Sequence, residues 1–87
     1  MPEDDKKMAE GLQSVILTMQ IVDQVARTGK GVGVTSLATA LGTSKSRIHR
    51  HLQTLVQQGY IVQSPLTERY RLGAKLIELG NAAIHSS

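Results

Sequence analysis

The arrangement that most restricts the fold of this chain is a pair of amphipathic segments separated by a short turn. Residues 36–41 place their apolar side chains on one side of a short helix, and Gly42 can adopt the left-handed conformation that ends a helix. Thr43 or Ser44 can cap a second helix, which we expect over about residues 44–58. Because so short a turn keeps two helices in contact, the pattern predicts a helix-turn-helix unit.

The second helix of this pair has two chemically different faces. Ile48, Leu52 and Leu55 recur at helical spacing and form the apolar face. The opposite face and its flanks carry Ser46, Arg47, His49, Arg50, Gln53, Thr54 and Gln57. Arginine and glutamine donate hydrogen bonds to phosphate oxygens and base edges, whereas a carboxylate would repel phosphates. The helix is therefore a candidate surface for nucleic acid.

A β-hairpin is predicted over residues 60–72, where two β-prone runs flank a proline-containing turn. Tyr70 and Leu72 give the second run an apolar face. Arg69 and Arg71 alternate with them and give the other face two guanidinium groups. A hairpin in this position is the wing of a winged helix. The predicted fold class is mainly α with a small antiparallel β wing, a winged helix-turn-helix.

Positive charge is concentrated in the middle of the chain. The net charge of the 87 residues is only +3, but residues 24–75 contain eight lysines and arginines against one acidic residue, Glu68. So one-sided a stretch attracts a polyanion. Two tyrosines and no Phe or Trp leave few side chains on which single-stranded bases can stack. The charge therefore favours binding of a duplex.

The predicted contacts at the start of the second helix are of two kinds. Ser44, Lys45 and Ser46 lie beside the free amides of the helix N-terminus, a position that favours a phosphate. Arg47 and Arg50 follow one turn later. We expect both to enter the major groove, where arginine commonly binds guanine.

The remaining predicted contacts come from the rest of the helix and from the wing. Gln53 is a candidate to read adenine, and His49 and Thr54 flank it on the same surface. Arg69 and Arg71 are expected to hold the flanking backbone or the minor groove. Together these residues define the candidate DNA-binding surface.

A first helix is predicted from about Ser14. Its expected apolar face consists of Val15, Thr18, Met19, Val22, Val25 and Ala26. Ile16 and Leu17 lie off that face, and we expect them to form a dimer interface with a second subunit. The glycine-rich segment 29–33 ends this helix, and residues 32–34 are a candidate edge strand. No Gly-Lys-Ser/Thr sequence follows that segment, which argues against a phosphate-binding loop.

The two ends of the chain differ in character. Residues 1–10 are charged and aperiodic, which predicts a disordered acidic tail. A last helix is predicted from Ala74 to about Ile84. Its side chains available for packing are Leu76, Ile77, Leu79 and Ala83.

Catalysis and metal binding find little support in the sequence. His49 and His51 point about 200° apart on a helix, so they cannot share a metal ion, and the chain has no cysteine to complete a site. His51 is expected to be packed or hydrogen-bonded. Neither paired carboxylates nor a nucleophile with a nearby base are present. We therefore expect no enzyme activity, no catalytic residue, no metal and no cofactor.

A membrane location is also not expected. The longest uninterrupted apolar run, residues 15–17, is far shorter than the roughly 20 residues of a membrane span. The acidic start of the chain does not match a signal peptide. These features predict an intracellular protein.

Several short motifs follow one another along the chain at specific spacings. They are Ser14-Val15, Ile21-Val22-Asp23, Leu37-Ala38, Leu41-Gly42, Lys45-Ser46-x-Ile48-His49-Arg50, Leu52-Gln53-Thr54-Leu55, Gly59-Tyr60-Ile61 and Arg69-Tyr70-Arg71-Leu72-Gly73. The set resembles the amino-terminal winged helix-turn-helix domain of IclR-type transcriptional regulators. The similarity covers about residues 12–80.

The resemblance implies sequence-specific binding of double-stranded operator DNA in a bacterial cytoplasm, by a homodimer or a dimer of dimers. Members of the family also carry a carboxy-terminal domain that binds a small-molecule effector. No segment here corresponds to that domain, so we expect this chain to be a fragment. We expect a small-molecule effector to bind only the absent carboxy-terminal domain. The expected organisation is a tail (1–10), a DNA-binding domain (11–73) and the start of a linker helix (74–87).

The chain departs from the family's usual pattern at several positions. Ser44 replaces a frequent proline, and a helix can still start there. His51 replaces an aliphatic residue, which suggests altered packing of the second helix. Glu68 replaces a glycine and leaves the turn type of the wing open. Arg47 stands where a small hydroxyl residue is frequent, so the operator sequence of a relative cannot be transferred.

A second interpretation stays open at this point. Winged helices also serve as protein-interaction modules, and the basic face can dock an acidic partner. Binding to duplex DNA that weakens steeply with salt and prefers one sequence distinguishes the two interpretations.

Overall fold

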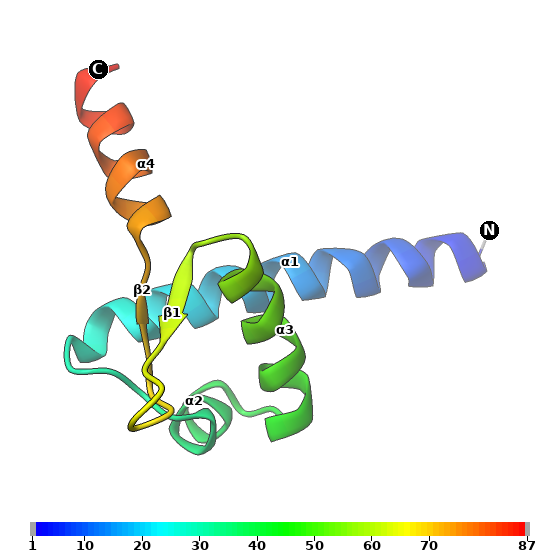
Figure 1. The fold of residues 1–87 in the computed structure, drawn as a ribbon. Coiled ribbons are helices and arrows are strands. Elements are labelled where there is room, and N and C mark those ends of the chain that lie inside the picture. The colour runs from blue at the N-terminus through cyan, green and yellow to red at the C-terminus, as the bar shows by residue number, and fades with distance from the viewer. Residues whose placement is uncertain (1, 87) are drawn as a thin grey trace.

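Helices make up most of the chain, and a short hairpin packs among them. The computed structural model describes residues 2–86. In that range the elements are α1 (Pro2–Thr28), α2 (Val34–Leu41), α3 (Lys45–Gln57), β1 (Ile61–Gln63), β2 (Tyr70–Leu72) and α4 (Ala74–His85). Figure 1 shows the C-terminal half of α1, together with α2 and α3, gathered around the hairpin, while α4 extends away. The predicted fold class, mainly α with a small antiparallel β wing, is confirmed.

One hydrophobic core joins the three packed helices to the hairpin. Its fully buried large side chains are Ile21 of α1, Leu37 of α2, Ile48 and Leu52 of α3, and Ile61 of β1. Burying a side chain of this size contributes roughly 1.5–3 kcal/mol to the free energy of folding. Because every one of these elements contributes to the same core, the core fixes α3 relative to the hairpin.

The turn between α2 and α3 has the predicted chemistry. Gly42 takes the left-handed conformation (φ 64°), and the N–H of Thr43 donates to the carbonyl oxygen of Ala38 over 3.1 Å. Ser44 is the N-cap of α3, and its Oγ accepts a hydrogen bond from the N–H of Arg47 over 3.2 Å. The helix-turn-helix prediction is therefore confirmed.

The wing is an antiparallel hairpin with one additional strand contact. In its register Ile61 pairs with Leu72, Val62 with Arg71, and Gln63 with Tyr70. Val32, in the loop after α1, bridges to Tyr70: each backbone N–H donates to the other's carbonyl oxygen, over 3.0 and 2.8 Å. The edge strand predicted over residues 32–34 is therefore a single bridge, because α2 already begins at Val34.

The base of the wing depends on a glycine without room for a side chain. The N–H of Gly73 donates to the carbonyl oxygen of Tyr60 over 2.8 Å. A Cβ on Gly73 would overlap the carbonyl oxygen of Gly59 and lie 3.1 Å from the backbone nitrogen of Ile61. The second strand thus passes directly against the segment that follows α3.

The turn of the wing contains a strained residue. Glu68 has φ 61°, and it is the non-glycine residue with positive φ among residues 2–86. Its N–H donates to the carbonyl oxygen of Ser64 over 2.9 Å, which closes the turn. The turn that a glycine would favour is therefore retained, with Glu68 in the left-handed conformation.

The structure corrects the predicted start of the first helix. α1 begins at Pro2 and not near Ser14, so the backbone of residues 2–10 is helical where a disordered tail was predicted; residue 1 lies outside the described residues. Lysine, methionine, alanine and glutamate, which make up most of this segment, are strong helix formers. A segment without apolar periodicity has no face that packs on a core, but it can still form a helix.

The structure also corrects the predicted packing face of this helix. Val25 is buried and Val22 packs partly against the core, as predicted, but Leu17 and Ile21 are buried in place of Val15 (51% exposed) and Met19 (61% exposed). α1 is apolar over two adjacent stripes, and the core takes most of its α1 side chains from the stripe that was not predicted. The prediction that Leu17 contacts a second subunit is therefore wrong, because its side chain belongs to the core.

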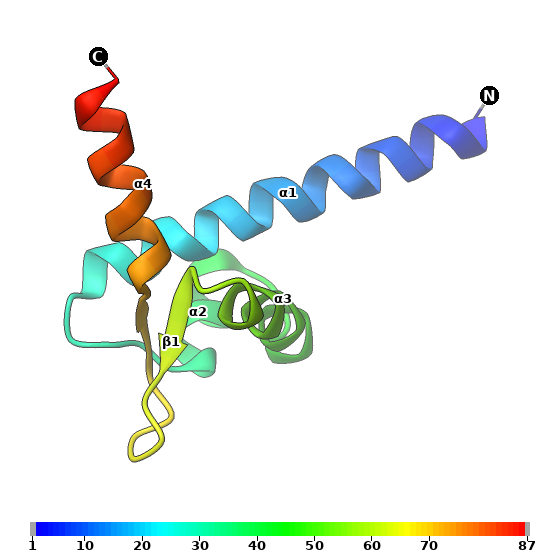
Figure 2. The same cartoon turned by 45° about the horizontal axis from the view of Figure 1, so that its top comes forward.

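The last helix does not pack as predicted. α4 contains no buried residue, and Ile77 is 68% exposed while Leu79 is 43% exposed. Leu76 is half-buried, and Ala83 is exposed. Figure 2 shows why: α4 leaves the wing and points away from the helices that form the core.

Replacing the glycine at the wing base tests its steric role. Gly73→Ala should lower the free energy of unfolding by about 1–3 kcal/mol, because the added methyl group must displace backbone atoms. Urea denaturation followed by circular dichroism measures this change. Gly80→Ala is the control, since a Cβ there meets nothing within 4 Å. Equal stability of the two variants would contradict the close approach.

Replacing Glu68 tests the strain in the wing turn. Glu68→Gly should raise the free energy of unfolding by about 1 kcal/mol, because glycine adopts positive φ without the penalty that a Cβ carries. Thermal denaturation should show a higher midpoint for this variant. Glu68→Ala removes the carboxylate but keeps the Cβ, so it should not be stabilised. A stabilised alanine variant would assign the effect to charge instead.

Candidate nucleic-acid interface

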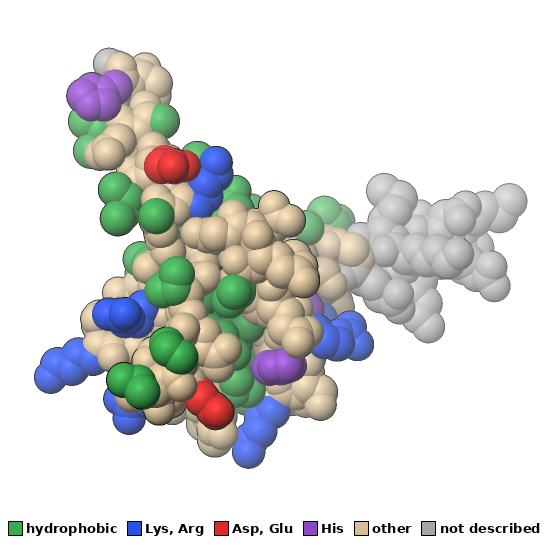
Figure 3. Space-filling model, viewed as in Figure 1, with side chains coloured by type: hydrophobic (Ala, Val, Ile, Leu, Met, Phe, Trp, Pro, Cys, Tyr) green, Lys and Arg blue, Asp and Glu red, His purple; other side chains and the backbone are tan. Residues whose placement is uncertain are grey.

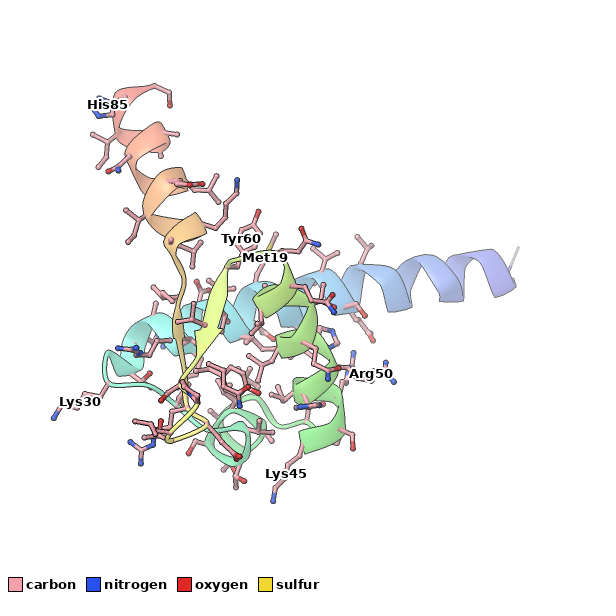
Figure 4. The ribbon with its side chains drawn as sticks, viewed as in Figure 1. Met19, Lys30, Lys45, Arg50, Tyr60 and His85 are labelled. Atoms are coloured by element: carbon pink, nitrogen blue, oxygen red, sulfur yellow. The ribbon has the colours of Figure 1, made fainter. Side chains whose placement is uncertain are left out.

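The outer face of α3 is open to solvent. Its exposed residues are Lys45, Ser46, His49, Arg50, Gln53, Thr54, Val56 and Gln57. All except Val56 carry a hydrogen-bonding group, and none is acidic. In Figure 4, Lys45 extends beyond the N-terminal end of α3 and Arg50 extends from the side of α3 away from the wing. Most of the residues predicted to contact DNA therefore share one accessible surface.

Arg47 is placed differently from the other predicted contacts on α3. It is half-buried and lines a groove formed with Gln13, Ile16 and Gln20 of α1 and with the α2–α3 turn. Arg50, by contrast, is exposed. The two arginines predicted to enter the major groove therefore differ in exposure, and Arg50 is the more accessible of the two.

His51 is held by its own helix. It is half-buried, and its Nδ1 lies 2.8 Å from the carbonyl oxygen of Arg47. Because a carbonyl can only accept a hydrogen bond, Nδ1 carries the proton and donates it. The expectation of a hydrogen-bonded histidine is confirmed, and the aliphatic position of the family pattern is filled by a ring tied to the backbone.

A polar groove lies between α1 and α3. It is lined by Ser14 and Thr18 of α1 and by Arg50, His51 and Thr54 of α3. The hydroxyl of Thr18 donates to the carbonyl oxygen of Ser14 over 2.8 Å. Sequence reasoning did not assign Ser14 and Thr18 to this surface, because Thr18 was counted as part of the apolar face of its helix.

A second groove separates α3 from the wing. His49, Gln53 and Gln57 line it on the helix side, together with Val56, and Gln63 and Tyr70 line it on the wing side. The Nε2 of Gln63 donates to the carbonyl oxygen of Glu68 over 3.1 Å. Gln63 was not singled out from the sequence. Its pairing with Tyr70 across the hairpin, which faces both side chains toward α3, is the signal that identifies it.

Tyr70 lines this groove and also belongs to the hydrophobic core. Burial raises the pKa of its hydroxyl above the usual value, and the nearby Glu68 carboxylate raises it further. The phenol therefore stays protonated and neutral at physiological pH. Its ring is 3% exposed and is part of the hydrophobic core.

The two arginines of the wing lie on the opposite face of the hairpin. Both are exposed, and Arg71 pairs with Val62 on the side away from α3. The loop after α1 passes beneath them: a Cβ on Gly31 would lie 3.1 Å from Cβ of Arg69 and 3.4 Å from Cγ of Arg71. Lys30 extends outward from the same loop (Figure 4). Sequence reasoning missed this lysine, although the glycines on either side of it were the signal for a close approach.

The basic side chains of this surface have no acidic partner among residues 11–86. Among the residues whose side chains are described, the ion pair is Lys75 Nζ with Glu78 Oε2, 3.6 Å apart on α4. Figure 3 shows Lys and Arg side chains around the lower part of the molecule, over the wing and the N-terminal end of α3. Unpaired cations are available to phosphates without first breaking a salt bridge.

The described residues show neither a metal cluster nor a membrane helix. No group of three His, Cys, Asp or Glu side chains among them lies close enough to hold a metal ion. No helix in the described part of the chain is long and apolar enough to cross a membrane.

The sequence matches known regulators over this whole region. The model of the IclR helix-turn-helix domain matches residues 14–65. The chain is 39% identical to the HTH-type transcriptional regulator XynR of Escherichia coli over 75 residues, 86% of this chain and 30% of that protein. It is 33% identical to the glycerol operon regulatory protein of Streptomyces griseus, again over 86% of this chain and 30% of that protein. The chain thus spans about a third of the length of these relatives.

Solved structures agree with this result. HmgR of Pseudomonas aeruginosa superposes with a TM-score of 0.78 at 31% identity, over 85% of this chain and 32% of that one. A transcriptional regulator of Alicyclobacillus acidocaldarius superposes with a TM-score of 0.75 at 30% identity, over 82% of this chain and 29% of that one. The winged-helix arrangement is therefore shared with structures of transcriptional regulators.

The N-cap of α3 offers a direct test of how the interface is positioned. Ser44→Ala should lower the free energy of unfolding by about 1 kcal/mol, because the N–H of Arg47 loses its acceptor. Chemical denaturation measures the loss. Ser46→Ala, which removes an exposed hydroxyl from the first turn of the same helix, should leave stability nearly unchanged. Equal effects of the two substitutions would show that the cap does not stabilise α3.

Proposed function

The chain belongs to the IclR family of helix-turn-helix transcriptional regulators and matches the helix-turn-helix domain of that family. From this premise we propose how it binds its operator. In the proposal residues 11–73 bind double-stranded DNA in a sequence-specific manner. Helix α3 lies in the major groove, and the wing contacts the flanking backbone or minor groove. The activity is binding, not catalysis.

The observation that carries this proposal is the chemistry of the outer face of α3. The face is rich in donors, contains no carboxylate, and has no described acidic partner for its cations. Its helix is also the one whose opposite face is most deeply packed, with Ile48 and Leu52 both fully buried. A rigid donor surface on a core helix suits the major groove, which presents base edges at a fixed geometry.

The N-terminal end of α3 is proposed to bind a backbone phosphate. Lys45 and Ser46 are exposed there, beside backbone amides that the helix leaves unpaired. The Oγ of Ser44 already accepts from Arg47, but its O–H is free to donate to a phosphate oxygen. This contact sets the register of the helix and carries no base preference.

Base recognition is assigned to the middle of α3. Arg50 and Gln53 are exposed one turn apart and match the pairings of arginine with guanine and glutamine with adenine. His49 and Thr54 flank them on the two sides of this face. Arg47, half-buried against α1, is assigned to a phosphate at the edge of the site and not to a base.

The wing contributes charge on its outer side. Arg69 and Arg71 face away from α3, so they are proposed to hold the phosphate backbone beyond the groove that α3 occupies. Lys30 adds a third cation from the neighbouring loop (Figure 4). These contacts should add to affinity and to its salt dependence more than to specificity.

Dimerisation is proposed to use the exposed apolar stripe of α1. Its members are Leu12 (62% exposed), Val15 (51%), Ile16 (54%) and Met19 (61%). They recur at the spacing of one helical face and lie away from the core. Ile16 keeps its proposed role in a homodimer or dimer of dimers, which would read a palindromic operator.

The rest of the proposal follows the family. Residues 74–87 are proposed to begin a linker helix. A small-molecule effector is proposed to act on the whole regulator through a further domain, which corresponds to the region of the relatives outside the match. A regulator that binds operator DNA works in the cytoplasm, and this is the proposed location.

Two single substitutions test the assignment of roles on α3. On duplexes selected by this chain from a random pool, Arg50→Ala should cost about 1–3 kcal/mol of binding free energy and relax the base preference at one position. Lys45→Ala should weaken binding to all duplexes alike and reduce the salt slope by about 1. Fluorescence anisotropy over a series of salt concentrations measures both.

Lys75→Ala is the matched control for these variants. It removes a lysine that is paired with Glu78 on α4, away from the proposed surface, so binding should not change. If Arg50→Ala and Lys45→Ala bound every duplex as tightly as the parent chain, α3 would not be the docking helix.

A further inference from the structure

The end of the wing presents an apolar side chain to solvent. Leu66 is 93% exposed, whereas the other exposed large hydrophobic residues between positions 11 and 86 are 38% to 70% exposed. Pro65 precedes it and is also exposed. A single exposed leucine is ordinary in a mobile loop, so its meaning depends on how the turn around it is built.

The turn that carries Leu66 is held by several hydrogen bonds. The Oγ of Ser64 accepts from the N–H groups of both Leu66 and Thr67, each over 3.3 Å. The N–H of Arg69 donates to Oγ1 of Thr67 over 3.3 Å, and the N–H of Ser64 donates to the carbonyl oxygen of Arg69 over 2.9 Å. The backbone that carries Leu66 is therefore held in place before any partner binds, and little backbone conformational entropy remains to be lost.

The position of the turn relates it to the DNA-binding surface. In Figures 1 and 2 the turn of the wing projects on the side of the molecule opposite α4. The N-terminal end of α3 lies on that same side in Figure 1. The turn leads directly into Arg69, the first of the two wing arginines. An approaching duplex that receives α3 in one groove therefore meets the turn at a neighbouring groove.

The dimensions of DNA decide which groove the turn can enter. The major groove is about 12 Å wide and admits a helix, whereas the minor groove is about 6 Å wide. A hairpin whose strands are about 4.8 Å apart is too broad for the minor groove once its side chains are counted, but a single side chain at its tip fits. Besides polar contacts, proteins that bind the minor groove frequently insert apolar side chains into it, leucine and proline among them.

We propose that Leu66, supported by Pro65, enters the minor groove beside the segment that α3 reads and packs against its sugars and base edges. This inference rests on the proposed function and names a specificity-determining residue within it. The exocyclic amino group of guanine projects into the minor groove, where A·T pairs have only acceptors. Because that amino group would obstruct an inserted leucine, Leu66 favours flanking A·T pairs. The proposed function assigns no hydrogen bond to a base at this position.

The test varies only the minor groove of the flanking DNA. A duplex selected by this chain from a random pool is prepared with its flank as A·T, as G·C or as inosine·C pairs. Inosine lacks the 2-amino group of guanine and keeps its major-groove acceptors. Binding of the 87-residue chain and of Leu66→Ser is measured by fluorescence anisotropy on all three duplexes. Ile77→Ser, a similar loss of an exposed aliphatic side chain on α4, is the control.

The parent chain and Ile77→Ser should bind the A·T and inosine·C flanks about 5- to 10-fold more tightly than the G·C flank. Leu66→Ser should bind all three flanks equally while it keeps its preference for the selected site over random DNA. Retained flank discrimination in Leu66→Ser would overturn the assignment of Leu66. Absence of flank discrimination in the parent chain would also overturn it. Failure of the parent chain to select any duplex would instead contradict the proposed function itself.

Discussion

The packing of one face of α3 against the core decides what its other face can do. Ile48 and Leu52 are both 0% exposed and meet Ile21, Leu37 and Ile61 from three other elements. A rotation of α3 by one residue, about 100°, would carry these side chains toward solvent and bring polar groups into the core. The donor-rich face is thus held in place by apolar burial, although the binding that it performs is electrostatic.

The wing is tied to that same body by backbone contacts. Val32 and Tyr70 exchange two hydrogen bonds, and Gly73 lies against the segment that follows α3. Tyr70 adds a buried ring to the core. The cations of the wing and of α3 are therefore carried by one packed body, and a duplex can meet both without a costly rearrangement of the chain.

Sequence reasoning succeeded where the signal was local and failed where tertiary packing made the choice. Gly42 marks the end of α2 through its backbone conformation, and Ser44 marks the start of α3 through its side-chain cap. The helix-turn-helix unit was therefore predictable. The face of α1 was not, because Met19 and Leu17 lie on neighbouring apolar stripes and only the position of the other helices selects between them. For Arg47, sequence spacing alone could not show that its side chain lies half-buried in a groove beside α1. The helical start of α1 was missed because an aperiodic charged segment can still be a helix.

The most direct test of the central claim is a residue-by-residue map of the surface that DNA touches. Amide chemical shifts of the isotopically labelled chain are followed by NMR during titration with a duplex that the chain has selected. The account predicts that the largest changes fall on residues 44–57 and on the wing between residues 63 and 71, while α4 changes little. Changes concentrated on α4 or on the exposed stripe of α1, with α3 unaffected, would contradict the account.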